Sequence, residues 1–71
     1  MGSYSIRKLV AANIRRLRLE HNETQEELSN VIGYSVPAVA NYEKGYRTPD
    51  LETFIRIAKH YGASIEDFLK E

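Results

Sequence analysis

Apolar residues recur at intervals of three and four along almost the whole chain, and a polar residue suited to helix capping precedes each such stretch. This spacing places the apolar side chains on one face of a helix, whereas a half-buried strand would require strict alternation. The repeats predict five helical segments, which begin near Ser5, Thr24, Ser35, Asp50 and Ser64. The expected fold class is therefore all-α, a compact five-helix domain in which residues 1–71 form one unit.

Local chemistry predicts where the second and third segments begin and end. Thr24 and Glu27 have the spacing of a capping box, in which each side chain bonds the other residue's amide. Gly33 ends the second segment, since glycine readily takes the positive φ found just after a helix. Pro37 falls in the first turn of the third, where a missing N–H costs little. We expect two short helices around a tight turn, over residues 24–44.

The composition excludes several classes of protein. The 71 residues include no cysteine, so disulfides and thiolate metal sites are ruled out. His21 and His60 lie far apart without neighbouring ligands, and no nucleophile, carboxylate pair or phosphate loop stands out. We therefore expect no metal, no cofactor and no enzymatic activity. A chain this short relies on tight helix packing, and self-association is a further source of stability for domains of this size.

No apolar run approaches the roughly 20 residues that a membrane span needs, and no secretory signal is visible. The expected compartment is the cytoplasm. Residues 1–4 are expected to be disordered or a cloning remnant.

The formal net charge is zero, which argues mildly against a nucleic-acid partner, because phosphate neutralisation favours basic domains. The charges are unevenly distributed along the chain, because residues 5–18 carry five basic side chains and no acid. Acids fall mainly at predicted helix starts, where the helix dipole favours them. An ordinary solvated surface is the alternative, and this is the main interpretation of Arg7, Lys8, Arg15 and Arg16.

Two short helices separated by a tight turn at residues 33–35 satisfy the geometric description of a helix-turn-helix. In that motif the second helix enters the DNA major groove while the first crosses the backbone. Geometry alone leaves open a helical hairpin inside an ordinary bundle.

Short motifs in a definite order favour the first of these interpretations. They are IRRLR at 14–18, TQEEL at 24–28, IG at 32–33, NYEKG at 41–45, and IA with YG at 57–62. With this spacing the sequence resembles the phage-repressor-like (XRE) helix-turn-helix family over about residues 6–69. The resemblance implies a lambda-repressor-like five-helix fold and a small transcriptional regulator, a repressor, which binds double-stranded DNA through a recognition helix at about 35–44.

The resemblance also implies contacts to the DNA backbone. Gln25 corresponds to a glutamine that bonds a phosphate, at a helix start whose free amides attract anions in any case. Arg18 and Glu43 resemble a partly buried salt bridge of the family, so both are read as structural. The other implied backbone contacts are Ser35, Lys44, Tyr46 and Arg47.

Positions 36, 37, 40 and 41 correspond to the family's base-contacting face. The sequence departs here from the common pattern, because Val36, Pro37 and Ala40 are apolar where Gln, Arg or Ser is frequent. Only Asn41 can both donate to and accept from a base edge, and asparagine suits adenine. We hypothesise an A/T-containing half-site, read by Asn41 and by methyl contacts to thymine.

Related regulators commonly bind two half-sites as dimers, so a homodimer on DNA is expected. Its candidate interface is Ile65, Phe68 and Leu69, unless all three pack inward. The zero net charge and the apolar third segment keep one other function open. In this alternative, the same fold serves as a protein-interaction module, either antitoxin-like or an adaptor.

Overall fold

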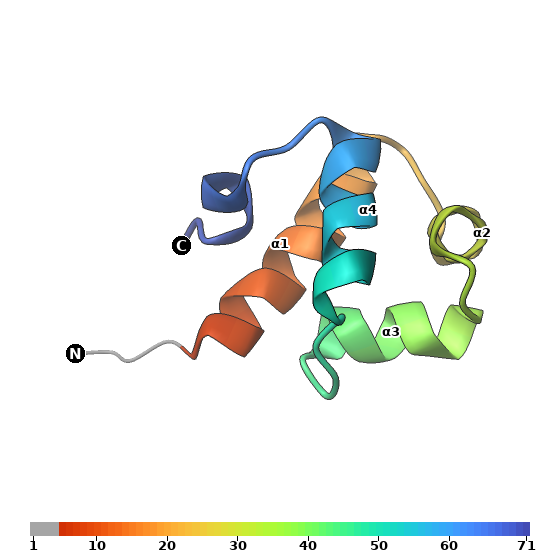
Figure 1. Cartoon of the computed structure of the whole chain (residues 1–71), viewed down its shortest axis with the longest axis horizontal. Coiled ribbons are helices and arrows are strands. Elements are labelled where there is room, and N and C mark those ends of the chain that lie inside the picture. Colours follow the sequence, from red (N-terminus) through yellow and green to blue (C-terminus); the bar gives the residue numbers. More distant parts are fainter. Residues whose placement is uncertain (1–4) are drawn as a thin grey trace.

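The computed structural model describes residues 5–71, so the expectation for residues 1–4 lies outside the described part. In this range the chain forms four α-helices and one 3-10 helix, and no β-strand (Figure 1). The elements, in chain order, are α1 (Ile6–Glu20), α2 (Gln25–Ile32), α3 (Val36–Lys44), α4 (Leu51–Tyr61) and η1 (Ile65–Phe68). The all-α expectation is confirmed.

The α-helices begin at the capping residues that the sequence predicts. Asp50 accepts a hydrogen bond of 2.8 Å from the amide of Thr53 at the start of α4. At the start of α2, the Thr24 hydroxyl accepts from the Glu27 amide at 3.1 Å, and the Glu27 carboxylate accepts from the Thr24 amide at 2.8 Å. Gly33 follows α2 with φ +77°. The predicted capping box and helix end are thus confirmed.

The fifth predicted helix is a single 3-10 turn, which corrects the count to four α-helices. Its start is as expected, since the Ser64 amide donates to the Asp67 carboxylate at 2.9 Å. The backbone carbonyls of Asp67 and Phe68 then accept from side chains of α1, Arg16 and Asn13, at 2.8 and 2.9 Å. The backbone bonds of η1 span three residues, from the Asp67 amide to the Ser64 carbonyl at 3.1 Å and from the Leu69 amide to the Glu66 carbonyl at 3.0 Å, as in a 3-10 turn.

Every element contributes to one hydrophobic core. α4 turns a stripe of residues inward that includes Ile57, which is fully buried. The spacing of the apolar residues in 51–61 also predicts that Leu51 and Ile55 face inward, but they are 74% and 44% exposed. The core residues are Val10, Ile14, Leu17, Leu28, Ile32, Val39, Tyr42, Ile57, Tyr61 and Phe68.

Two polar side chains of α1 hold the C-terminal end of the domain. Asn13 is 3% exposed, and its amide nitrogen lies 2.9 Å from the carbonyl oxygens of Leu9, Phe68 and Lys70, which share its two N–H groups. Arg16 donates to the Asn13 side chain at 3.0 Å as well as to η1. The interpretation of Arg16 as mainly part of a solvated face is wrong, since its guanidinium joins α1 to η1.

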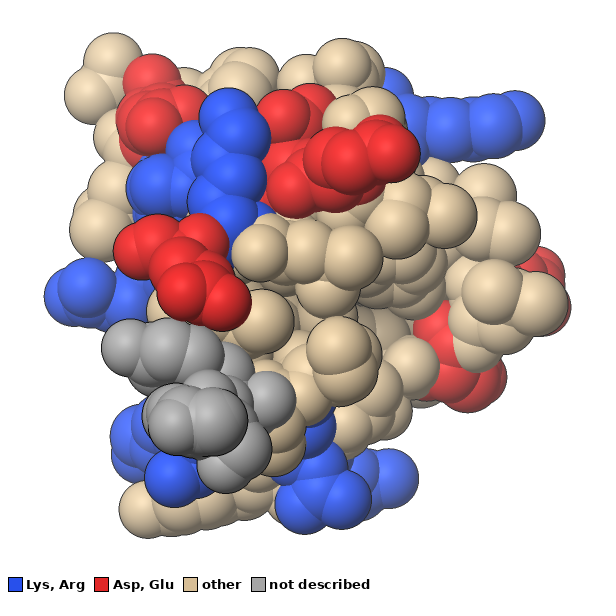
Figure 2. Space-filling model, turned by 90° about the vertical axis from the view of Figure 1, so that its left-hand side faces the viewer, with Lys and Arg blue, Asp and Glu red and all other residues tan. Residues whose placement is uncertain are grey.

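An apolar groove of about 430 Å³ lies between the start of α1, the start of α4 and η1. Its rim includes Ile6, Ile65 and Leu69, all exposed. Figure 2 faces this side of the molecule and shows a broad uncharged area in its middle. Phe68 does not belong to the rim: it is fully buried, 4.8 Å from the Phe54 ring in an edge-to-face contact. Phe68 is therefore a core residue and is removed from the predicted interface.

Within residues 5–71 no helix has the length and apolar character that a membrane crossing demands.

Candidate nucleic-acid interface

Helices α2 and α3 form the helix-turn-helix unit. In Figure 1 α2 is seen almost end-on while α3 runs across the view, so the two axes are strongly inclined. The turn is held by backbone bonds from Gly33 and Tyr34 to the Ser29 carbonyl, at 2.9 and 3.1 Å. Leu28 and Val39, both fully buried, fix each helix to the core. The second helix of the unit therefore lies at the molecular surface in a fixed orientation.

The solvent-facing side of α3 carries the four residues predicted to contact bases. Val39 and Tyr42 face the core, so the opposite side of the helix is left to solvent. Val36 and Pro37 are exposed there, and Ala40 and Asn41 are half-buried. The structure thus brings Val36, Pro37, Ala40 and Asn41 together on one face, three of them apolar.

Basic and aromatic side chains continue from this face into the following loop. Tyr46 is 71% exposed, and Arg47 and Lys44 are also exposed. The Lys44 ammonium lies 5.8 Å from the centre of the Tyr46 ring. The amides of Tyr46 and Arg47 donate to the Asn41 carbonyl at 3.0 and 3.3 Å, which keeps the loop against the end of α3. Ammonium, phenol and guanidinium groups are all capable phosphate donors.

Arg18 and Glu43 form a two-pronged ion pair between α1 and α3. Arg18 Nε lies 2.6 Å from Glu43 Oε2, and Nη2 lies 3.1 Å from Oε1. The side chains are 9% and 3% exposed. The hydrogen bond to Glu43 raises the pKa of Arg18, although burial opposes this. Glu43 is the only acid in α3, so the pair turns the helix's one negative charge away from solvent.

The predicted phosphate contacts at the two helix starts also have partners within the domain. Gln25, the first residue of α2, donates from Nε2 to Glu43 Oε1 at 3.1 Å. Ser35 caps α3, its hydroxyl accepting from the Ala38 amide at 3.3 Å. Gln25 is half-buried and Ser35 is exposed. The bond to Glu43 fixes the direction of the Gln25 amide at the start of α2.

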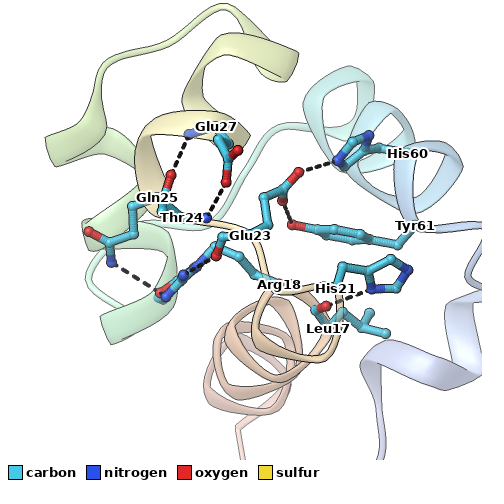
Figure 3. A network of polar contacts seen from close by, with 10 residues as sticks. Leu17, Arg18, His21, Glu23, Thr24, Gln25, Glu27, His60 and Tyr61 are labelled. Carbon is cyan, nitrogen blue, oxygen red and sulfur yellow. Dashed lines mark hydrogen bonds and ion pairs between the residues drawn. The ribbon is translucent and has the colours of Figure 1, made fainter.

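A second polar cluster, which the sequence does not predict, lies behind the site. Glu23, in the α1–α2 connection, pairs with His60 Nε2 at 2.6 Å and accepts a hydrogen bond from the Tyr61 hydroxyl (Figure 3). Burial, and then the bond to Glu23, raise the pKa of Tyr61 above its usual value. Arg18 Nη1 also donates to the Glu23 carbonyl at 2.6 Å. These contacts attach the start of α2 to the end of α4 and to α1.

No local pattern in the sequence indicates this cluster, because Glu23 lies 37 and 38 residues before its two partners. His60 lies in the last turn of α4, where the helix dipole favours a positive charge in any case. The structure shows that the Glu23 carboxylate is the partner of His60. Across residues 5–71 no group of histidines and acids has an arrangement that could hold a metal ion.

Comparison with known proteins identifies the family. A protein family described as Helix-turn-helix matches residues 14–68. The transcriptional repressor RstR of the cryptic phage CTXphi, from Vibrio cholerae, is 38% identical over 63 residues, which are 89% of this chain. The chain spans 57% of the length of RstR. An uncharacterised HTH-type transcriptional regulator of Methanocaldococcus jannaschii is 39% identical over 54 residues, covering 76% of this chain and 82% of that protein.

Solved structures show the same fold. The clp gene regulator ClgR from C. glutamicum has a TM-score of 0.84 and 24% identity, over 96% of this chain and 87% of ClgR. The restriction–modification controller protein C.Esp1396I has a TM-score of 0.77 and 23% identity, over 93% of this chain and 86% of that one. The likeness shows that this chain shares the all-helical fold of these two proteins, its own fifth element being a 3-10 turn. The family match over most of the chain, together with the relatives above 30% identity, shows that this chain belongs to the helix-turn-helix (XRE) family of DNA-binding transcriptional regulators, which are not enzymes.

Proposed function

We propose that residues 1–71 act as a single domain that binds double-stranded DNA sequence-specifically and represses transcription, with α3 in the major groove. The observation that carries this proposal is the position of Glu43. Its carboxylate is turned into the ion pair with Arg18, so the solvent-facing side of α3 presents no negative charge to DNA. RstR is a transcriptional repressor, and a regulator of this kind acts where a prokaryotic genome lies, in the cytoplasm.

The residues on the outer side of α3, at the helix starts and in the loop after α3 have separate proposed roles. Asn41 reads an adenine, because its amide N–H can donate to adenine N7 while its amide oxygen accepts from the N6 amino group. Val36, Pro37 and Ala40 contact thymine methyl groups. Phosphates are bound by the residues at the helix starts and in the loop after α3, namely Gln25, Ser35, Lys44, Tyr46 and Arg47.

Asn41→Ala is expected to weaken binding to the selected DNA site by about 1–3 kcal/mol, since a bidentate base contact is worth that much in discrimination. The site would be obtained by in vitro selection, and affinity measured by fluorescence anisotropy. Asn30→Ala is the matched control, because Asn30 is an exposed asparagine on α2. Equal affinities for the wild type and Asn41→Ala would eliminate the base contact.

The net charge of zero and the three apolar side chains on α3 would also suit a protein-interaction module. The dependence of affinity on salt separates the two functions. A DNA-binding domain loses affinity steeply between low and physiological salt, because binding releases counterions from phosphates. Binding to duplex DNA that is absent, or indifferent to salt, would favour the protein partner.

We further propose a homodimer on DNA, with Ile65 and Leu69 of the apolar groove at its interface. Ile65 is 64% exposed and Leu69 36% exposed, and both line the groove. Ile65→Lys is expected to reduce the complex on a two-half-site duplex from two protomers to one, as measured by analytical ultracentrifugation. Glu66→Lys, at the neighbouring exposed position, is the control. Two bound protomers with Ile65→Lys would place the interface elsewhere.

A further inference from the structure

The first half of α1 lies against the end of α3. A Cβ built on Gly45 would lie 3.7 Å from the Cβ of Ala11 and 3.9 Å from the Cγ of Lys8. The aliphatic stem of Lys8 therefore runs beside the residue that ends the recognition helix. Its ammonium group belongs to the same part of the surface as the loop that carries Tyr46 and Arg47.

Arg15 lies on the same side of α1 as Lys8. The two are seven residues apart in one continuous helix, which is nearly two full turns, so their side chains leave the helix in similar directions. Ala11, which lies between them in the sequence, is beside Gly45. Arg18, three residues after Arg15, pairs with Glu43. Arg15 thus flanks the same end of α3.

Both side chains lie on the solvent side of the α1–α3 contact. In α1 the core residues Ile14 and Leu17 occupy one side of the contact, and Lys8 and Arg15 occupy the other. In α3 Val39 lies on the core side and Lys44 on the solvent side. The outer flank of α1 therefore continues the surface formed by the outer face of α3.

The positive charges of Lys8 and Arg15 are not neutralised by ion pairs within the described part of the domain. Arg16 and Arg18 of α1 form ion pairs with Glu20 and Glu43. Lys8 and Arg15, by contrast, take part in no ion pair in the described range 5–71. They are two exposed cations held beside three other phosphate donors.

Figure 2 shows the resulting distribution of charge. It is turned from Figure 1 about the vertical axis, so its lower edge is the side of α3 and the loop after it. The charged side chains visible along that lower edge are all lysine or arginine, and the acidic ones lie higher. A chain with zero net charge therefore has one edge that is locally basic.

We propose that Lys8 and Arg15 extend the contact with the DNA backbone from the loop after α3 onto α1. This inference rests on the proposed function. The phosphates that meet Lys44 and Arg47 continue along the same strand past the outer flank of α1. Lys8 and Arg15 are exposed there and form no ion pair within residues 5–71, and both would be sequence-independent phosphate contacts.

The test is the slope of log affinity against log salt for one protomer bound to a duplex with a single half-site of the selected sequence. Each phosphate contact contributes about 0.9 to the magnitude of that slope, or about a 3.5-fold change in affinity between 50 and 200 mM salt. Lys8→Gln and Arg15→Gln are each expected to lower the magnitude by about 0.9, and the double variant by about 1.8. Thermal unfolding of each variant would show that the fold is kept.

Lys59→Gln is the matched control, because it removes the same charge from the last turn of α4, at the end of the molecule opposite α3 (Figure 1). Its slope should equal that of the wild type. A double variant with the wild-type slope would overturn the inference. If Lys44→Gln and Arg47→Gln still lower the slope in that case, the proposed function stands, whereas a wild type without salt-dependent binding would overturn both.

Discussion

Glu43→Ala is expected to lower the free energy of unfolding by about 3–5 kcal/mol, because the substitution leaves the Arg18 charge buried without its partner. The two side chains are 9% and 3% exposed, so water cannot replace the lost carboxylate without rearrangement. Domains of this size have roughly 4–10 kcal/mol of stability, so the variant should be barely folded. Urea unfolding followed by circular dichroism measures the loss.

A second variant separates the loss of the pair from the burial of an unpaired charge. Arg18→Met combined with Glu43→Leu removes both charges and keeps apolar volume, and such replacements are often neutral or stabilising by about 1–4 kcal/mol. We therefore expect the double variant to be far more stable than Glu43→Ala. A loss below about 1 kcal/mol in Glu43→Ala would mean that the pair behaves energetically like an exposed one.

Phe68→Ala is expected to cost about 3–5 kcal/mol, the usual range for truncating a buried phenylalanine. Phe68 is fully buried and meets the Phe54 ring edge to face, so the truncation opens a cavity between η1 and α4. The denaturant midpoint measures the effect, with Glu66→Ala in the same turn as a control that should stay within about 0.5 kcal/mol. A loss comparable to that of the control would show that η1 can detach without cost to the remaining helices.

The helix boundaries could be predicted because their causes are local. A capping bond such as that between Thr24 and Glu27 spans three residues, and the turn at Gly33 depends on that residue's own φ. The solvent-facing side of α3 follows from the same periodicity. The ion pair of Arg18 with Glu43, by contrast, was expected only from the family resemblance.

The remaining features depend on contacts between distant parts of the chain. Periodicity placed Ile55 inward, but the position of α1 and α2 against α4 selects the stripe that contains Ile57. Asn13 bonds to carbonyls 55 and 57 residues later, and Glu23 bonds to α4. From the sequence alone, a single asparagine or glutamate is interpreted as a surface residue, because only the fold brings its distant partner close.

The solvent-facing side of α3 takes little part in holding the domain together. Val36, Ala40 and Asn41 are outside the hydrophobic core, and the ion pair and the Glu23 cluster do not use them. Substitutions at these three positions should therefore leave folding almost unchanged. Under the proposed function, a duplicated copy of this chain can acquire a different DNA target through a few such changes, and two copies can diverge into regulators that no longer compete for one site.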